Sequence, residues 1–337
     1  MPPAPPPPDL SAVAALLPSL QGTEVVVLGD FVADEYVFGE TERISREAPV
    51  LIVRYESAEL KAGGAGNAAQ NLAALGVKVR ALGVVGDDPL GVALLDELER
   101  GGIDVTGLLP VKGRATEAKT RFLAGGRSTR RQQMLRLDRG PDGPPPPAVE
   151  RKLLAELRRV ARRSGAVLAS DYGSGVVGPT AVEALRRVKG AGTPVCVDSR
   201  YALRQFTGLT MVKPNEAELE AASGVRLSGP GGLEKAARAL LRRVACEILL
   251  VTRGRHGLSV FRPGLAPVHL PAFGSQDAVD VTGAGDTVAA AFTAGLAAGA
   301  GAVAAAALAN VAGSLQVQKP GTATVSRAEL AAALGLA

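Results

Sequence analysis

The sequence predicts an α/β fold with a doubly wound, mainly parallel sheet and a small antiparallel β lid beside it. Three observations support this prediction. Short apolar runs recur along the chain, helical patterns lie between most of them, and two segments break the alternation with the period of hairpin strands. The apolar runs lie at 25–28, 79–85, 166–170, 194–198, 210–212 and 248–252. Strands that are covered by helices on both faces are nearly continuous in apolar residues, so these runs favour a parallel sheet.

Helical patterns fill most of the intervals between these runs. They lie at 65–75, 149–163 and 180–189. The segments that break the alternation lie at about 36–60 and 113–138, and we expect them to form hairpin strands inserted into the main fold. Together they would form a small sheet suited to act as a lid.

The length of 337 residues allows two domains or one large α/β domain. We assign 1–20 to a proline-rich tail and leading segment, in which 1–8 are extended or disordered, and 21–337 to a single domain that includes the lid segments. The stretch 288–318 has no charged residue and is long enough to span a bilayer. Its Ala and Gly content and its polar side chains predict two buried helices instead.

Composition excludes several classes of protein. Two cysteines without a C-x-x-C pair do not favour a disulfide scaffold or a cysteine-ligated zinc site. The net charge of +5 favours anionic partners, but with 3% aromatic residues and no Trp we expect phosphorylated small molecules and no nucleic acid. The start of the chain lacks the basic and apolar regions of a signal peptide, so we expect a cytoplasmic protein with no membrane partner.

The string Asp280-Val-Thr-Gly-Ala-Gly-Asp286-Thr287 precedes an apolar helical stretch. The small residues at 283–285 would let backbone N–H groups at a helix N-terminus approach an anion, such as a phosphoryl group in transfer. Asp286 would lie in the first helical turn, where a carboxylate can accept the proton of an attacking hydroxyl. The alternative is a Gly-rich turn in which Asp286 only caps the helix.

A second Gly-rich string covers residues 63–71. Its part at 64–69 also satisfies G-x-G-x-x-A, the dinucleotide fingerprint, and Asp87 follows at a suitable distance. A nicotinamide oxidoreductase is therefore an alternative prediction. The fingerprint is a weak signal here because it follows hairpin material and not the first core strand.

A third string, Lys213-Pro-Asn215-Glu-Ala-Glu218, follows a predicted strand and opens a helix. Asn215 and Glu218 share one helix face, and two oxygen ligands there suit a hydrated Mg²⁺ that carries a nucleotide. The alternative is an ordinary helix start with a capping Asn. The chain contains neither a P-loop nor a G-x-S-x-G motif, and the catalytic loop of protein kinases is also absent.

In order and spacing, these strings resemble the ribokinase/PfkB family of carbohydrate kinases from about Val25 to Ser326. The resemblance also includes 86–91, a G-x-D-x-x-G-like segment, and rests above all on D-x-T-G-A-G-D at 280–286. It implies a ribokinase-like fold, often with the lid shared across a homodimer. It further implies transfer of the γ-phosphoryl of Mg-ATP to a sugar hydroxyl.

The resemblance implies a role for each matching residue. Asp286 is then the catalytic base, and Gly283, Ala284 and Gly285 form the anion hole. The residues implied to bind the nucleotide are Asn215, Glu218, Thr252, Gly254, Gly257 and Asn310, of which Asn215 and Glu218 organise Mg²⁺. The residues implied to contact sugar hydroxyls are Asp34, Gly63, Gly64 and Asn67. Backbone oxygens around Asp280 and Thr282 match the site of a monovalent cation, such as K⁺, in some members.

A narrower resemblance is to the kinase module of the heptose-7-phosphate kinase/adenylyltransferase family. It rests on the Arg-Ile-Ser-x-Glu-Ala-Pro-Val string at 43–50 and on shorter matches at 170–175 and 198–200. It implies phosphorylation of D-glycero-β-D-manno-heptose 7-phosphate at O1, on the route to ADP-heptose. A phosphorylated sugar needs a cationic pocket, and the candidate residues are Lys119, Arg121 and Arg136. We expect Arg127, Arg130 and Arg131 to be solvated lid charges.

Some features depart from this narrower family. The bifunctional members carry an H-x-G-H motif in a nucleotidyltransferase domain, which this sequence lacks, so a separate adenylyltransferase is expected in the pathway. Asp-Ser-Arg stands at 198–200 where Asp-Pro-Lys is common. A kinase for another sugar or sugar phosphate, such as fructose, ribose or a ketose phosphate, therefore remains an alternative. A sugar-phosphate sensor without activity is disfavoured because Asp286 is intact.

Overall fold

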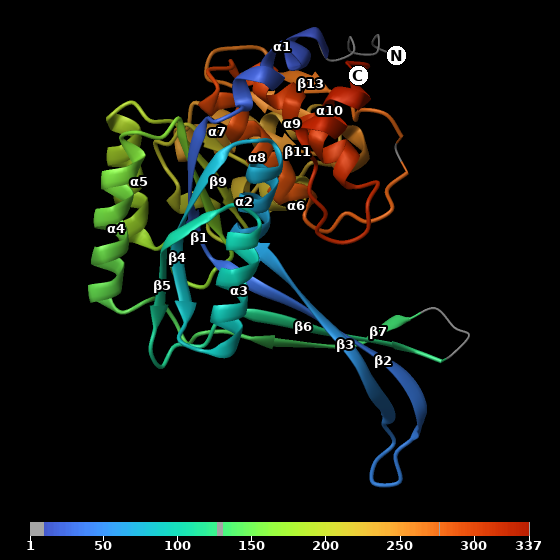
Figure 1. The fold of residues 1–337 in the computed structure, drawn as a ribbon. Helices are drawn as coiled ribbons and strands as arrows, with labels where there is room; N and C mark the ends of the chain where they lie inside the picture. Colours follow the sequence, from blue (N-terminus) through green and yellow to red (C-terminus); the bar gives the residue numbers. More distant parts are fainter. Residues whose placement is uncertain (1–9, 127–130, 276, 337) are drawn as a thin grey trace.

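A computed structural model describes residues 10–126, 131–275 and 277–336. Its main sheet has the strand order β13-β12-β11-β10-β9-β8-β1-β4-β5 (Figure 1). The strands that pair in parallel are β5 (Asp104–Val111), β4 (Lys78–Gly86), β1 (Glu24–Gly29), β8 (Ala166–Asp171), β9 (Val195–Ser199), β10 (Met211–Val212) and β11 (Ile248–Thr252). The antiparallel edge consists of β12 (Leu258–Phe261) and β13 (Val268–Leu270).

Helices cover both faces of this sheet, and each face has its own apolar core. The first core includes side chains from α1 (Leu10–Leu20), α2 (Ala65–Ala74), α3 (Pro89–Arg100), α8 (Ala284–Ala297), α9 (Ala302–Gln316) and α10 (Arg327–Ala333). The second includes α4 (Pro147–Ala161), α5 (Pro179–Gly190), α6 (Glu216–Ser223) and α7 (Gly232–Val244). Two short 3-10 helices, η1 (Leu203–Gln205) and η2 (Gly254–His256), follow strands of the sheet.

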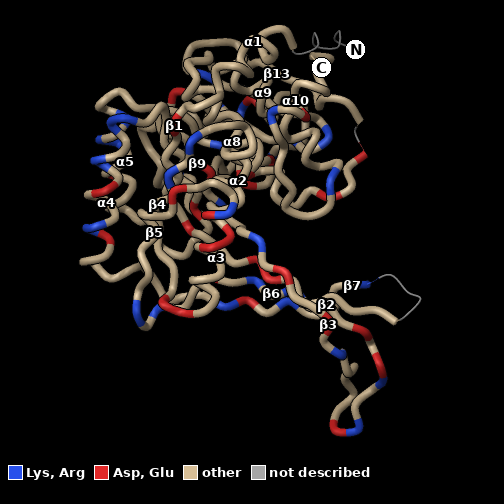
Figure 2. The backbone as a smooth tube through the Cα atoms, in the orientation of Figure 1, with Lys and Arg blue, Asp and Glu red and all other residues tan. Residues whose placement is uncertain are grey.

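A second sheet projects from the main body as an arm (Figure 1). Its strands lie in the order β3-β2-β6-β7 and comprise β2 (Phe31–Ile44), β3 (Leu51–Gly64), β6 (Ala118–Gly125) and β7 (Gln132–Arg139). All neighbours are antiparallel except β2 and β6, which are parallel. Lys and Arg alternate along the arm with Asp and Glu (Figure 2). The predicted α/β class, with a mainly parallel sheet and a small antiparallel one, is confirmed.

The sequence placed the start of the arm too late. The first hairpin was expected from residue 36, whereas β2 begins at Phe31, with only Asp30 between it and the end of β1. Helix α1 was also not predicted, although Val13, Leu16, Leu17 and Leu20 are buried at helical spacing. The predicted proline-rich segment 1–8 lies outside the described residues.

The uncharged stretch at 288–318 folds as expected into two packed helices, α8 and α9. Gly299, with φ of 84°, lies in the turn between them. Both helices contribute many fully buried residues to the first core. Across the described residues, no helix is both long and apolar enough to cross a bilayer.

Candidate active site

The parallel strands of the main sheet end along one edge, and polar residues follow several neighbouring strands there. Asp30 follows β1, Tyr172 follows β8 and Lys213 follows β10. This edge, the N-terminus of α8 and the arm border a cleft of about 1440 Å³. Ligands of doubly wound sheets bind at the carboxyl ends of the strands, so the cleft has the expected position for a functional site.

Asp286 lies in the first turn of α8 and is 5% exposed. Both of its carboxylate oxygens accept a hydrogen bond: Oδ1 from the Tyr172 hydroxyl and Oδ2 from the Asn67 amide, each at 2.7 Å. Burial raises the pKa of Asp286 to about 6, the nearby charge of Asp198 adds to this rise, and the two hydrogen bonds oppose it. The carboxylate is therefore held in place as a base that is ionised near neutral pH.

The small residues before Asp286 form the helix N-terminus that the sequence predicted. Gly283 is the N-cap of α8 and has φ of 81°, a conformation that favours glycine. A Cβ at this position would lie 2.6 Å from the Asn67 amide nitrogen, so a side chain would also disturb the partner of Asp286. Gly283, Ala284 and Gly285 all line the cleft. The Ala284 N–H donates to the Val281 carbonyl at 3.2 Å, so it is used within the protein. The N–H groups of Gly283 and Gly285 remain at the start of the helix, where an anion is stabilised.

A buried ion pair joins two other strand ends beside this turn. The Lys213 ammonium lies 2.9 Å from Asp198, and the Lys213 side chain is only 4% exposed. Burial disfavours its charge, but the adjacent Asp198 carboxylate outweighs this and raises the pKa of Lys213. A positive charge is thus fixed in the cleft wall next to Gly285 and Asp286.

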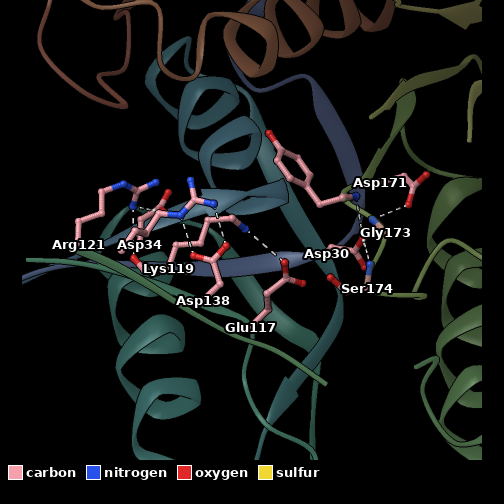
Figure 3. Close-up of polar contacts among 11 residues, drawn as sticks. Asp30, Asp34, Glu117, Lys119, Arg121, Asp138, Asp171, Gly173 and Ser174 are labelled. Carbon is pink, nitrogen blue, oxygen red and sulfur yellow. Dashed lines mark hydrogen bonds and ion pairs between the residues drawn. The ribbon is translucent and has the colours of Figure 1, made fainter. Parts of the chain in front are cut away.

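Asp30 organises the loop that carries Tyr172. Its carboxylate accepts hydrogen bonds from the backbone N–H groups of Tyr172 at 2.7 Å and Ser174 at 3.1 Å (Figure 3). It also accepts one from the N–H of Val176 at 3.3 Å. Burial raises the pKa of Asp30 to about 6, although these hydrogen bonds favour its charge. Through this loop, Asp30 positions the tyrosine that contacts Asp286.

The arm supplies the other wall of the cleft, and charged side chains pair along it (Figure 3). Arg121 lies 2.6 Å from Asp34, and Lys119 lies 3.3 Å from Glu117. Arg136 lies directly across from Arg121 in the strand register and pairs with Asp138 at 2.8 Å. The three cationic residues predicted from the sequence therefore lie together on adjacent strands of the arm.

The predicted nucleotide residues line the opposite end of the cleft. Asn215 and Glu218 form a capping box at the start of α6, in which Asn215 Oδ1 accepts from Glu218 N–H and Glu218 Oε2 accepts from Asn215 N–H, both at 2.8 Å. The helix-start interpretation is thus correct as a description of the local structure. The capping box uses Glu218 Oε2 and leaves Glu218 Oε1 for a ligand. Asn310, on α9, donates to the Pro271 carbonyl at 2.6 Å.

The structure brings most of the predicted residues into this one cleft. Those that line it are Asp34, Gly64, Lys119, Arg121, Arg136, Asn215, Glu218, Thr252, Gly254, Gly257, Asp280, Thr282, Gly283, Ala284, Gly285, Asp286 and Asn310. Asn67 is fully buried and does not line the cleft. Its amide contacts Asp286, so it would act on a sugar hydroxyl indirectly, through that carboxylate. Gly63 lies against Asp34, since a Cβ there would be 2.2 Å from Asp34 Oδ2.

The dinucleotide alternative gains no support from this geometry. The helix that begins at Ala65 follows an arm strand, and its first N–H, that of Ala65, donates to the Asp30 carbonyl at 3.0 Å. That N–H is consequently used within the protein.

Sequence reasoning assigned no role to Asp30, Tyr172, Asp198 or Lys213. Each lies at or just after the end of a core strand, and this position was the signal that could have identified them. Their pairing could not be inferred, because Tyr172 and Asp286 are 114 residues apart.

Comparison with known proteins identifies the family. Residues 23–329 match the model of the pfkB family carbohydrate kinases. The bifunctional protein HldE of Pelobacter propionicus is 38% identical over 331 residues, which cover 98% of this chain and 67% of that protein. HldE of Geobacter sulfurreducens is 40% identical over 327 residues, or 96% of this chain and 65% of that protein. The chain thus spans about two thirds of the length of these curated relatives.

Solved structures agree on the fold. A structure of Arabidopsis thaliana ribokinase complexed with ribose and ATP superposes with a TM-score of 0.73 at 22% identity, covering 94% of this chain and 100% of that one. Phosphofructokinase-2 from Escherichia coli in complex with potassium gives 0.75 at 18% identity, covering 94% and 99%. With the family match over nearly the whole chain, these findings assign the protein to the pfkB family of carbohydrate kinases.

Proposed function

We propose that this kinase transfers the γ-phosphoryl of ATP to O1 of D-glycero-β-D-manno-heptose 7-phosphate. The observation that carries the proposal is the position of Lys119, Arg121 and Arg136 on the arm wall of the cleft that contains Asp286. Cationic side chains on the arm wall, away from the α8 turn that carries the base, suit a sugar with a phosphate remote from its reacting hydroxyl. The similarity to HldE proteins over the whole chain supports the same branch of the family.

The arm wall carries more positive than negative side chains. Among the described residues of the arm, four cationic side chains line the cleft, those of Lys61, Lys119, Arg121 and Arg136. Two arm carboxylates, Asp34 and Glu59, line it with them. Arg121 is held in place by Asp34 and by the Tyr36 ring, whose centroid lies 5.2 Å from the guanidinium carbon. A guanidinium held in this way can bind phosphate through two parallel hydrogen bonds at little entropic cost.

The nucleotide would bind at the opposite end, near Asn215, Thr252, Gly254, Gly257 and Asn310. No group of three or more His, Cys, Asp or Glu side chains among the described residues is arranged to bind a metal directly. Glu218 Oε1 fits a Mg²⁺ held through water and the nucleotide phosphates, which is how this ion is usually bound, and Asn215 would position it through the capping box. When bound, Mg²⁺ would neutralise charge on the transferring phosphoryl group.

In the proposed reaction, the sugar oxygen attacks the γ-phosphorus while its proton passes to Asp286. The bond to the β-γ bridging oxygen breaks, and ADP leaves. The N–H groups of Gly283 and Gly285 stabilise the charge on the phosphoryl group, and Lys213 adds a positive charge in the same wall. The arm would act as a lid that excludes water. The new anomeric phosphate suits a following adenylyl transfer by a further activity.

ADP release with Mg-ATP tests this function against a panel of heptose 7-phosphate, sedoheptulose 7-phosphate, fructose 6-phosphate, fructose and ribose, with Asp286→Asn as the blank. Turnover on heptose 7-phosphate alone, absent in the blank, is expected. In addition, Arg121→Gln should raise KM for heptose 7-phosphate by about tenfold or more, because a charge-assisted contact is lost. A preference for an unphosphorylated sugar would refute the substrate and leave the kinase class intact.

We further propose that two copies pair through the arm. Leu135 and Leu137 flank the cleft-facing Arg136, so they point to the other face of the sheet. Tyr55 and Val53 point there too, because the β2–β3 register shifts after Phe38 and pairs them with Gly39 and Thr41, which alternate with the cleft-facing Phe38. All four side chains are exposed. Burying such an apolar face would stabilise a homodimer. Sedimentation of the wild type and of Tyr55→Glu/Leu135→Glu tests this, with a monomeric wild type as the contradicting result.

A further inference from the structure

Gln316, the last residue of α9, is fully buried beneath the loop that precedes Asp286. Its side-chain nitrogen donates to the Thr282 carbonyl at 2.8 Å and to the Gly321 carbonyl at 3.1 Å. Among the described residues, Gln316 Oε1 has no hydrogen-bond partner. The two carbonyls determine the orientation of the amide, because the reverse orientation would bring three oxygens together.

The surrounding contacts join three segments of the chain at this point. Asp280 Oδ1 accepts from Thr282 N–H and Asp280 Oδ2 from Gly321 N–H, both at 2.9 Å. The Val317 carbonyl accepts from the backbone N–H of Asp280 at 3.2 Å. The loop that leads into the α8 N-terminus is therefore bound to the end of α9 and to the segment around Gly321, with the Gln316 amide between them.

A monovalent cation in this position would need the same oxygens. Dehydrated K⁺ is coordinated by carbonyl and carboxylate oxygens that replace its hydration shell. Here the Thr282 and Gly321 carbonyls already accept from the amide, and both carboxylate oxygens of Asp280 accept from backbone N–H groups. The described residues thus do not fit a cation at Asp280 and Thr282, where the family resemblance led us to expect one.

We propose that the Gln316 amide replaces the monovalent cation and makes this kinase independent of K⁺. Its two N–H groups hold the carbonyls of both loops as a cation would, without adding charge. Through Thr282, the amide positions the residues that follow at once, the 283–285 anion hole and Asp286. Gln316 is in this view a positioning residue, since its contacts are with the loops.

Three variants separate this role from a simple packing role. Gln316→Met keeps the length of the side chain and removes the donor, and Gln316→Glu keeps its shape and replaces the donor by an acceptor. Gln318→Met is the matched control, because Gln318 is exposed and donates to the Asp277 carbonyl, outside the Thr282 loop. Each protein is compared in KCl, NaCl and tetramethylammonium chloride at equal ionic strength.

Two readouts are measured. In the wild type and in Gln318→Met, kcat and the unfolding temperature should be the same in all three salts. Both Gln316 variants should lose about tenfold in kcat without K⁺, as expected for a lost buried hydrogen bond, and recover part of it in KCl. Their unfolding temperature should rise in KCl relative to tetramethylammonium chloride. The measurement of the unfolding temperature needs no sugar, so it remains decisive even if the proposed substrate is wrong.

Either of two results would overturn the proposal. One is activation or specific thermal stabilisation of the wild type by K⁺. The other is a pair of Gln316 variants that keep full activity and show no response to K⁺ in either readout.

Discussion

Ionised Asp286 lowers the stability of the folded protein, and Asp286→Asn makes this effect measurable. Burial raises the pKa of the carboxyl from 3.8 to about 6. A difference of that size corresponds to about 3 kcal/mol. The folded chain holds this proton more tightly than the unfolded chain, so the wild-type free energy of unfolding falls as pH rises from about 4 to about 6. The amide of Asp286→Asn does not ionise and avoids the loss.

Urea unfolding of both proteins from about pH 4 to pH 8 gives the comparison. The difference, variant minus wild type, should increase by about 3 kcal/mol up to about pH 7 and stay level above it. The pKa of Asp30 is also raised to about 6, but that group is present in both proteins and cancels in the difference. Any fixed penalty from placing an amide opposite Asn67 shifts the whole difference and not its pH dependence.

Activity supplies the second half of this test. As the base, Asp286 must be ionised, so kcat/KM of the wild type should rise with pH through about 6. Asp286→Asn should lose about a hundredfold to ten-thousandfold in kcat. A stability difference that does not vary with pH would refute the raised pKa. Turnover retained in the variant would refute the assignment of the base.

Three further substitutions follow from the same geometry. Tyr172→Phe removes a hydrogen bond that lowers the pKa of Asp286, so the acid limb of the kcat/KM profile should move up by about one pH unit; an unmoved limb would contradict this. Lys213→Met leaves the Asp198 carboxylate unpaired and should lower the free energy of unfolding, measured in urea, by about 3–5 kcal/mol. A decrease below about 1 kcal/mol is typical of a solvated ion pair and would contradict the burial of this one. Gly299→Ala, with φ of 84° and open space at the Cβ, should cost about 1–2 kcal/mol for its left-handed backbone and leave kcat unchanged. Gly283→Ala should cost more than this, because its Cβ also meets the Asn67 amide at 2.6 Å, and it should reduce kcat as well; equal losses of stability with unchanged kcat would contradict this.

The sequence predicted those parts of the fold and site that depend on local pattern. The two helices in 288–318 followed from an uncharged run with a glycine break, and the α8 N-terminus followed from the small residues before Asp286. Contacts across long separations could not be predicted. Asn67 contacts Asp286 across 219 residues, and its role as the partner of the base is visible only once α2 and α8 are packed together.

The beginning of the arm was missed for a different reason. Strand β2 starts at Phe31 with four buried residues, so its first part has the pattern of a core strand and not of an exposed hairpin. The alternation that indicates a strand with one exposed face appears only farther along. A segment that passes from the body into the arm has no single period to detect.

The unequal burial of the two sheets has a consequence for hydrogen exchange. All six residues of β8 are buried, whereas all eight of β7 are exposed. Amide protons in β7 should therefore exchange through local opening of the arm, and those in β8 only through global unfolding. A bound sugar phosphate should be detectable in β7, because its contacts with Arg136 would slow exchange there. The core strands are already protected, so their exchange would not change.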